Sequence, residues 1–514
     1  MSKGTFYITT PIYYPSDKLH IGHAYTTVAA DAIARFKKLT GYDVYFLTGS
    51  DEHGQKIERT AKEKGKTPQE YVDKIVAGFK HLWAELNVDY NDFIRTTEER
   101  HKKVVKTFFQ QLYEQGDIYK SSYKGWYCTP CETFFTEYQL EEGKCPDCGR
   151  EVELLEEESY FFRMSKYADR WLKFIEENPD FIQPDTRRNE MVSFVKQGLE
   201  DLCVSRTTFD WGIRVPFDPK HVVYVWVDAL TNYISALGYG SDNDQLYQKY
   251  WPANVHLVGK DIMRFHTIIW PIMLMALNLP LPKKVVGHGW LLLEGGKMSK
   301  SKGNVVDPLV LIDKYGADAV RYYLLRELPF GSDGYYSEEA LAKRINNDLA
   351  NDYGNLLSRT ASMLVKYQQG VLQKPQPQGE LDEELINLAL ETPKVVEDYM
   401  NKLQISAAAE AIGKLVARAN KYLEETAPWS LAKDEAQAER LNTVLYNVIE
   451  VMRFATVMLT PFMPNIPEKV WPQMGIEDKP ELHSWESLRW GQIPAGTVVQ
   501  RGEVLFPRID LSKL

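Results

Sequence analysis

Short apolar runs alternate with amphipathic stretches in the first part of the chain. Residues 6–9 and 43–48 have the pattern of buried strands, and residues 22–39 between them have the apolar spacing of a helix that Gly41 ends. Residues 67–115 carry apolar side chains at three-to-four spacing, which predicts a helical region. This order predicts a strand–helix–strand unit at the N-terminus, followed by more helix.

Strand patterns return in the middle of the chain at residues 221–227, 255–259 and 284–293, with helical stretches between them. Between about residues 119 and 220 the composition differs, with aromatic residues, glycines and cysteines. The pattern therefore predicts an α/β fold whose parallel sheet is interrupted by an insertion. After residue 337 the pattern is almost purely helical, which predicts a bundle built from residues 340–368, 381–402, 405–426 and 436–459.

The size and charge of the chain limit its architecture and its partners. Its 514 residues favour two to four domains over a single core. A formal net charge of -10 does not predict a nucleic-acid partner, so any RNA contact must come from local basic surfaces. The start shows no export pattern, and residues 267–281, the most apolar stretch, fall short of the about 20 residues that cross a bilayer. We expect a cytoplasmic protein with no membrane partner.

Four of the five cysteines form two close pairs in one short segment. Residues 132–144 separate the pair Cys128 and Cys131 from the pair Cys145 and Cys148. Four thiolates at this spacing fit a tetrahedral Zn²⁺ ion with no open position, which predicts one structural zinc per chain. A redox role for either pair is the alternative.

Two histidines stand between the first strand and the first helix, in the run His20-Ile-Gly-His23. A helix N-terminus offers free backbone N–H groups and partial positive charge, which suits a triphosphate. Gly22 has no side chain, so a nucleotide could lie against the backbone there. The alternatives are ordinary loop histidines and a metal site, although no third ligand stands nearby in the sequence.

A second phosphate-handling pattern runs from Lys297 through Met-Ser to Lys300 and follows two glycines. Its ammonium groups and hydroxyls could clamp a pyrophosphate leaving group, with a solvated basic loop as the alternative. Together, the H-I-G-H run after the first strand and the K-M-S-K-S run after a later strand of the same sheet resemble the two signatures of class I aminoacyl-tRNA synthetases. These enzymes activate an amino acid with ATP and transfer it to tRNA.

Over essentially its whole length the chain resembles the methionyl-tRNA synthetase family, in the bacterial form with one four-cysteine knuckle. The resemblance implies a catalytic domain with a Rossmann-type parallel sheet, an inserted zinc-binding connective domain and an α-helical anticodon-binding domain. The implied reactants are methionine, ATP with Mg²⁺, tRNA(Met) and initiator tRNA. The catalytic halves are implied at residues 1–118 and 221–289, the connective domain at 119–220, the K-M-S-K-S and stem-contact region at 290–350 and the anticodon-binding domain at 351–514.

The same resemblance assigns residues to the substrates. The implied catalytic groups are His20, His23, Lys297 and Lys300, and the residues implied for ATP are Gly22, His23, Gly287, His288, Lys297 and Lys300. The residues implied for methionine are Ile12, Tyr14, Asp51, Trp226, Ala229, Tyr233, Ile262, His266 and Trp270. Asp51 would bind the methionine ammonium group, with capping of the next helix as its alternative.

The spacing of Ile262, His266 and Trp270 places them on one face of a helix, and a stripe of core residues is the alternative to a pocket wall. The resemblance also implies an arginine near the active site at Arg206, with an ordinary surface cation as the alternative.

The helical C-terminal part carries residues that resemble the family's anticodon-reading positions, Asn355, Arg359 and Trp429. Amide and guanidinium groups can read exposed base edges, and an indole can stack on an unpaired base. Ordinary helix-surface residues are the alternative. The sequence stops at Leu514, without the C-terminal module through which some family members dimerise, so we expect a monomer.

Three other functions remain open at the level of sequence. Another class I synthetase, such as the cysteine enzyme, would hold zinc with mixed ligands in an open substrate site, whereas four cysteines close the shell. A small nucleotidyltransferase shares a histidine motif at the same turn but needs no anticodon-type bundle. The third alternative is a non-catalytic zinc protein that binds RNA.

Overall fold

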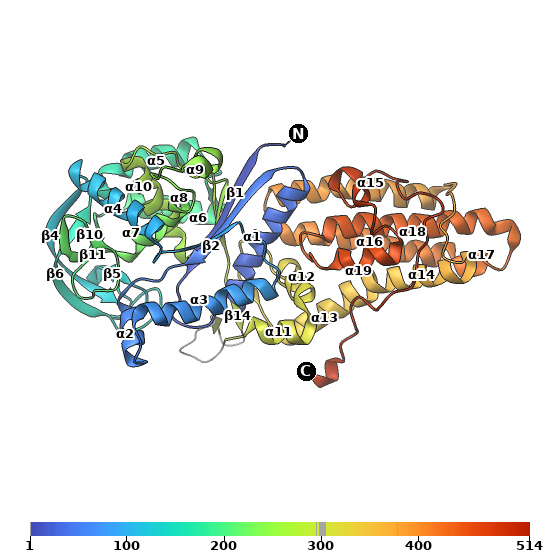
Figure 1. The fold of residues 1–514 in the computed structure, drawn as a ribbon, viewed down its shortest axis with the longest axis horizontal. Coiled ribbons are helices and arrows are strands. Elements are labelled where there is room, and N and C mark those ends of the chain that lie inside the picture. Colours follow the sequence, from blue (N-terminus) through green and yellow to red (C-terminus); the bar gives the residue numbers. More distant parts are fainter. Residues whose placement is uncertain (1, 294–295, 298–304, 378) are drawn as a thin grey trace.

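The chain forms an elongated molecule with an α/β part at one end and a helical bundle at the other (Figure 1). The computed structural model describes residues 2–293, 296–297, 305–377 and 379–514. Within these ranges no helix is both long and apolar enough to cross a membrane. The predicted α/β fold followed by a helical bundle is confirmed.

A six-stranded sheet in which every neighbouring pair runs parallel forms the centre of the α/β part. Consecutive residues of one strand, Tyr7 and Ile8, point to opposite faces and belong to separate apolar clusters, so both faces of the sheet are covered. The direction of the strand order changes between β1 and β12, which is where such sheets bind ligands. In spatial order the strands are β3 (Asp92–Arg95), β2 (Asp43–Ser50), β1 (Thr5–Tyr13), β12 (Val255–Gly259), β13 (Val285–His288) and β7 (Ile182–Gln183).

The helices of the α/β part pack around this sheet. α1 (Ile21–Leu39) follows β1 directly, as predicted, so its first turn lies at the carboxyl ends of the strands. The remaining helices are α2 (Gln55–Glu63), α3 (Pro68–Glu85), α4 (Glu99–Glu114), α7 (Val225–Leu230), α8 (Asn232–Ser235), α9 (Gln245–Tyr250) and α10 (Trp270–Ala276), with the 3₁₀ turn η3 (Lys260–Ile262) and the π-helical segment η4 (Phe265–Ile269) before α10.

The helical region predicted at residues 67–115 contains the two helices α3 and α4, with a strand between them that was not predicted. α3 ends after Glu85 because Asn87 takes a left-handed backbone with φ 53°. The chain then forms the short strand β3 before α4 begins. The apolar spacing of the two helices hides these four strand residues, which carry no punctuating glycine or proline of their own.

The prediction of a main-sheet strand at residues 221–227 is also wrong. β11 (Asp218–Val223) is antiparallel to its neighbours in a small separate sheet, and α7 follows it. The N–H groups of Val227 and Asp228 bond back to the carbonyl of Tyr224, so this run turns into a helix. Tertiary contacts of α7 therefore override the strand propensity of its valines and tryptophan.

An insertion separates the two halves of the sheet, as predicted. Its strand β7 joins the edge of the main sheet beside β13, so the insertion is anchored to that sheet. Its helices are α5 (Ala168–Glu177) and α6 (Asp185–Lys196). Its strands form one sheet of β5 (Thr133–Phe135), β4 (Ile118–Cys128), β6 (Glu153–Phe162) and β8 (Leu202–Cys203), and a second of β10 (Arg214–Val215), β11 and β9 (Ser205–Arg206).

The chain leaves the main sheet at Gly289. A side chain at Gly289 would meet the carbonyl oxygen of Ser332 at 2.1 Å, so only glycine fits this crossing. β14 (Leu291–Leu293) then pairs with β15 (Gly296–Lys297) and with β16 (Gly334–Tyr335) in a separate sheet. The K-M-S-K-S run therefore comes after a later strand of the main sheet, β13, as predicted, but it starts in a hairpin that belongs to a separate sheet.

The C-terminal part is a bundle of long helices, as predicted. Its helices bury their apolar stripes against one another and extend the cluster that covers one face of the main sheet. They are reached through α11 (Pro308–Tyr315), α12 (Ala317–Glu327) and α13 (Glu338–Arg344). The bundle consists of the π-helical segment η6 (Ile345–Gly354), α14 (Asn355–Gln368), α15 (Glu380–Asn401), α16 (Ile405–Thr426), α17 (Pro428–Leu431), α18 (Ala438–Leu459) and α19 (Ile466–Met474).

A buried ion pair fixes the bundle to the α/β part. Arg321 on α12 and Asp31 on α1 are both fully buried and lie 2.6 Å apart. Arg321 also donates to the carbonyls of Leu86, after α3, and Phe462, after α18, each at 3.0 Å. Because a buried guanidinium is stable only when its donors are satisfied, these contacts hold α1, α3 and α18 in one arrangement.

Candidate active site

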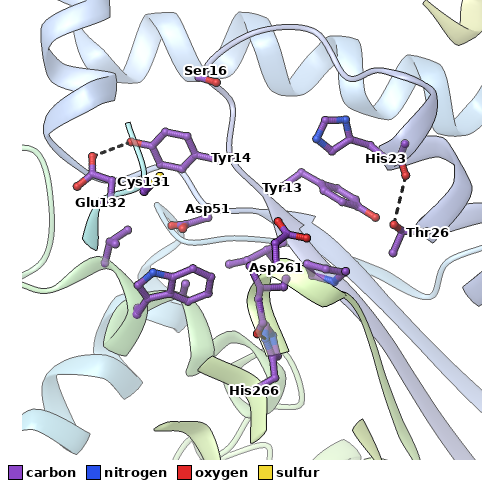
Figure 2. Close-up of a pocket in the computed structure, with 18 of the residues that line it drawn as sticks. Tyr13, Tyr14, Ser16, His23, Thr26, Asp51, Cys131, Glu132, Asp261 and His266 are labelled. Atoms are coloured by element: carbon purple, nitrogen blue, oxygen red, sulfur yellow. Dashed lines mark hydrogen bonds between the residues drawn. The ribbon is translucent and has the colours of Figure 1, made fainter. Parts of the chain in front are cut away.

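A cavity of about 530 Å³ opens at the carboxyl ends of the central strands (Figure 2). Its walls come from the loops after β1 and β2, the first turn of α1, the cysteine-containing turn, α7 and the segment after β12. Most predicted site residues in the described ranges line it, namely Ile12, Tyr14, His20, Gly22, His23, Asp51, Trp226, Ala229, Tyr233, Ile262, His266 and His288. Segments that are far apart in the sequence therefore meet at one edge of the sheet.

The first turn of α1 holds both predicted histidines. His20 is the N-cap residue, and its Nδ1 accepts a hydrogen bond from the N–H of Gly22 at 3.1 Å. His23 Nδ1 accepts from the N–H of His20 at 3.0 Å, so the two imidazoles cap the helix reciprocally. A side chain at Gly22 would meet the His20 ring at 2.9 Å. The expected placement of both histidines at a helix N-terminus is confirmed.

His288 links the end of β13 to the same helix. Its Nδ1 donates to the carbonyl of Gly289 at 2.7 Å, so its Nε2 accepts from the hydroxyl of Thr26 at 2.7 Å. Burial lowers the pKa of His288 below its ordinary value, which keeps the ring neutral. Gly287 does not line the cavity, because it packs closely on Met263, whose sulfur would lie 2.5 Å from any added side chain.

The apolar end of the cavity is walled by aromatic rings. Trp226 on α7 stacks on Phe265 with 3.7 Å between ring centroids. Tyr233 lies 2.6 Å from Nε2 of His266, whose Nδ1 lies 2.9 Å from the carbonyl of Ile262. Because a carbonyl only accepts, Nδ1 carries the ring proton and the Tyr233 hydroxyl donates to Nε2. Burial lowers the pKa of His266 to about 4, so this wall is uncharged at neutral pH.

Trp270 lies behind this wall and does not line the cavity. Its indole N–H donates to Nε2 of His256 at 3.2 Å, and Nδ1 of His256 lies 2.7 Å from the hydroxyl of Thr9 on β1. The predicted helical stripe of Ile262, His266 and Trp270 is wrong in its geometry, since a 3₁₀ turn, a π-helical segment and an α-helix carry one residue each. Trp270 supports Tyr233 from the core instead.

Asp51 follows β2 and lines the cavity beside Tyr14 (Figure 2). Its buried Oδ1 has no hydrogen-bond partner in the described part of the chain. Burial raises the pKa of Asp51 well above its ordinary value, and the carboxylates of Asp228, Glu132 and Glu52 raise it further. The alternative of helix capping is wrong, because the N-cap of α2 is Gly54. Asp51 is therefore an uncompensated acid that a cationic group would satisfy.

The sequence reasoning missed a buried polar chain beneath Asp51. The carboxylate of Asp228 on α7 is fully buried and lies 2.6 Å from Nδ1 of His53 and 2.7 Å from Nε2 of His101. His101 contacts the hydroxyl of Ser235 at 2.7 Å through Nδ1. Burial raises the pKa of Asp228, but the two imidazoles outweigh it and hold that pKa below its ordinary value. The four residues come from separate elements, so no local pattern signals them.

The four cysteines of the insertion converge, as predicted. The sulfur atoms of Cys128, Cys131, Cys145 and Cys148 all lie within 4.8 Å of one another. Cys128 and Cys145 are buried, and the four thiols offer soft ligands and no carboxylate or imidazole. This donor set fits a tetrahedral metal ion with a closed shell.

Arg206 is buried, and the alternative of a surface cation is wrong. Its guanidinium pairs with Glu157 at 2.6 Å and lies 4.0 Å over the ring of Tyr127. It does not line the cavity. Tyr127 in turn donates to the carboxylate of Glu132, which does line the cavity, so Arg206 supports the wall from behind.

The second phosphate motif lies mostly outside the described residues. Lys300 is outside them, and only the backbone of Lys297, in β15, is described. Trp290 and Leu291, at the start of the same hairpin, line the cavity. The chain therefore passes from the cavity directly into the segment that carries both lysines.

The three predicted anticodon residues gather at the surface of the bundle. Asn355 and Arg359 lie one turn apart on α14, and Asn355 is exposed. The guanidinium of Arg359 lies 5.8 Å from the centre of the Trp429 ring and pairs with Glu424 at 2.8 Å. A half-buried indole beside a cation offers a stacking surface for a base.

Comparisons with known proteins agree with this arrangement. A family profile described as tRNA synthetases class I (M) matches residues 6–154 and 148–361, and one described as anticodon binding domain of methionyl tRNA ligase matches residues 374–513. The chain is 67% identical over 511 residues to the methionine–tRNA ligase of Caldanaerobacter subterraneus subsp. tengcongensis, which covers 99% of this chain and 80% of that relative.

The ligase of the same name from Clostridium acetobutylicum is 62% identical over 513 residues, covering 99% of this chain and 79% of that relative. The structure of Mycobacterium tuberculosis methionyl-tRNA synthetase in complex with methionyl-adenylate superimposes with a TM-score of 0.95. It is 43% identical in sequence, and the match covers 98% of this chain and 100% of the other. Because these matches cover 98–99% of this chain in sequence and in fold, the chain belongs to the methionyl-tRNA synthetase family.

Proposed function

We propose that this chain activates methionine with ATP, releases pyrophosphate, and transfers the methionyl group from methionyl-adenylate to the terminal adenosine of tRNA(Met) and initiator tRNA. The observation that carries the proposal is the cavity itself. One end offers a carboxylate oxygen that has no partner among the described residues, beside neutral aromatic walls. The other end offers a helix N-terminus capped by two histidines. An amino acid and a triphosphate could therefore meet within one cavity.

Methionine takes the apolar end in this proposal. Its ammonium group pairs with Asp51, and its flexible side chain lies among the rings of Trp226 and Tyr233, where a polarizable sulfur packs well. The residues proposed around it are Ile12, Tyr14, Ala229, Ile262 and His266, with Trp270 supporting Tyr233 from behind. The neutral state of His266 keeps a competing charge away from the thioether.

ATP takes the other end. The methionine carboxylate attacks the α-phosphate, and charge grows on the departing pyrophosphate as the bond to it breaks. His20 and His23 stand where the backbone N–H groups of α1 already favour anions. We propose that the phosphate contacts are completed by Gly22, His288, Lys297 and Lys300. Gly287 lets Met263 pack beneath the phosphate site, and Mg²⁺ enters with ATP.

The remaining assignments of the proposal concern the rest of the chain. Zn²⁺ held by the four cysteines would act structurally, since four thiolates leave no position for substrate. Asn355, Arg359 and Trp429 would read the anticodon. We propose a cytoplasmic monomer, with catalytic halves at 1–118 and 221–289, a connective domain at 119–220, a stem-contact region at 290–350 and an anticodon-binding domain at 351–514.

Amino-acid-dependent exchange of pyrophosphate into ATP tests the proposal. The assay is run with each of the twenty amino acids, and exchange with methionine alone is expected. Exchange that requires cysteine would favour the related synthetase. Exchange that proceeds when no amino acid is added would favour a nucleotidyltransferase. An absence of exchange together with tight RNA binding would favour a non-catalytic RNA-binding protein.

A further inference from the structure

Glu132 directly follows the second cysteine of the first pair and has an unusual backbone. Its φ is 52°, a left-handed conformation that residues with side chains rarely adopt. Its N–H closes a turn onto the carbonyl of Thr129 at 3.4 Å. Such a conformation persists where surrounding contacts hold it, and it marks functional sites more often than others. Glu132 is only 6% exposed and lines the cavity (Figure 2).

The carboxylate of Glu132 joins two loops of the proposed methionine site. Its Oε1 accepts from the hydroxyl of Tyr14 at 3.3 Å, in the loop after β1. The same oxygen accepts from the N–H of Lys56 at 3.1 Å, in the first turn of α2, the helix that follows the Asp51 loop. The N-cap of α2 is Gly54, which has no side chain to cap the helix, so Glu132 supplies the cap from a distance.

A third part of the same site is held by the other atoms of Glu132. Its carbonyl accepts from the hydroxyl of Tyr224 at 2.7 Å, immediately before α7, the helix that carries Trp226 and Ala229. Its Oε2 accepts from the hydroxyl of Tyr127, on the strand that leads into the first cysteine pair. One residue of the cysteine turn therefore contacts three segments that form the methionine site.

The packing leaves space for this contact at one glycine. A side chain at Gly54 would lie 2.9 Å from Oε1 of Glu132 and 2.9 Å from the hydroxyl of Tyr14. Gly54 also has φ 121°, which residues with side chains avoid. The backbone of the Asp51 loop is thus shaped around the Tyr14–Glu132 pair.

We propose that Glu132 is a positioning residue for methionine binding, and that it transmits the metal-loaded geometry of the four-cysteine turn to the methionine site. This inference rests on the proposed function. The metal sets where Cys131 and its neighbours lie, and Glu132 converts that position into the placement of Tyr14, α2 and α7. Loss of the metal or of the Glu132 carboxylate leaves methionine with a site whose three walls are no longer held together.

Glu132→Ala, Glu132→Gln and the control Glu137→Gln are compared in steady-state pyrophosphate exchange. Glu137 lies in the same segment and is exposed. We expect Glu132→Ala to raise KM for methionine by about tenfold, the effect of about one charge-assisted hydrogen bond, with little change in kcat or in KM for ATP. Glu132→Gln keeps one oxygen acceptor for the Lys56 N–H, so its KM for methionine should lie between those of wild type and Glu132→Ala. A change confined to fold stability would lower kcat and leave KM for methionine unchanged.

The link to the metal is tested by calorimetric titration of methionine into the full chain, before and after metal removal with a chelator under reducing conditions. Metal removal should weaken methionine binding by wild type and by Glu137→Gln. In Glu132→Ala, metal removal should weaken methionine binding by less than about twofold further, because the connection through the Glu132 carboxylate is already absent.

Three results would overturn the proposal. They are a wild-type KM for methionine in Glu132→Ala, unchanged methionine binding by metal-free wild type, and an equal effect of metal removal on methionine binding by wild type and by Glu132→Ala. Failure of the proposed function looks different, since wild type would then show no methionine-dependent exchange.

Discussion

Replacing Asp51 with asparagine should change methionine binding and the stability of the free enzyme in opposite directions. The buried Oδ1 has no partner in the described residues, and Asp228 and Glu132 surround it with further negative charge. In the proposed function, a methionine ammonium group supplies the missing partner. Removing one member of such a buried pair costs about 3–5 kcal/mol, so kcat/KM for methionine should fall by about 200- to 5000-fold.

In the absence of methionine, Asp51→Asn should stabilise the protein instead of weakening it. Asparagine keeps the size of the side chain and removes an uncompensated buried charge, which should raise the free energy of unfolding by about 1–3 kcal/mol. The raised pKa means that the folded chain binds this proton more tightly than the unfolded chain does. Ionisation of Asp51 therefore lowers stability as the pH rises from about 4, the ordinary value, through the folded pKa. The stability gained by Asp51→Asn is absent at about pH 4, within about half a pH unit. It is complete above the folded pKa.

The two effects are measured in pyrophosphate exchange and in thermal unfolding without methionine, each over a pH series. Asp242→Asn, an exposed change outside the cavity, is the control. Methionine binding by wild type should weaken as the pH falls through the folded pKa of Asp51, because the protonated carboxyl no longer attracts the ammonium group. An unchanged KM for methionine, or a less stable variant at neutral pH, would refute the assignment of Asp51 as an unpaired ammonium site.

Three other changes test separate parts of the proposal. Trp429→Ala should raise KM for tRNA by about 5- to 150-fold, the loss of one base stack, while pyrophosphate exchange is unchanged; equal loss in both assays would contradict an anticodon role. Cys131→Ser should lower both the metal content and the melting temperature, measured by elemental analysis and calorimetry, whereas Cys203→Ser should retain the metal; full metal content in Cys131→Ser would count against the four-thiolate site. Lys300→Ala should slow adenylate formation by more than about tenfold and change methionine affinity little, and comparable loss in both would argue against a transition-state role.

The sequence motifs predicted the parts of the site whose position follows from local structure. H-I-G-H lies at a helix start because capping needs only neighbouring residues, and His20 and His23 provide it for each other. The cysteines converge because two short turns place each pair. The long bundle helices were predicted closely, since their apolar spacing extends over many turns, as in α16.

The parts that could not be predicted depend on contacts across the fold. α7 reads as a strand by propensity and becomes a helix because Asp228 is held by two histidines from other elements. β3 is too short for its pattern to stand out between two helices. Trp270 lies behind the cavity because π-helical geometry shifts the side chains of η4 and α10 away from a simple i, i+4 stripe.

The acids around the cavity explain why an amino acid suits it better than an uncharged ligand. Glu52 is paired with Arg95 through two hydrogen bonds of 2.7 Å, and Asp228 is held by two imidazoles. Glu132 accepts from three donors of the chain. Among these acids of the described residues, Asp51 and Glu132 line the cavity, and Asp51 alone has a buried oxygen without a partner. Because the protein satisfies these other carboxylates internally, a positive charge beside Asp51 must arrive with the ligand. We therefore propose that the α-ammonium group is the part of the substrate that this cavity selects most strongly.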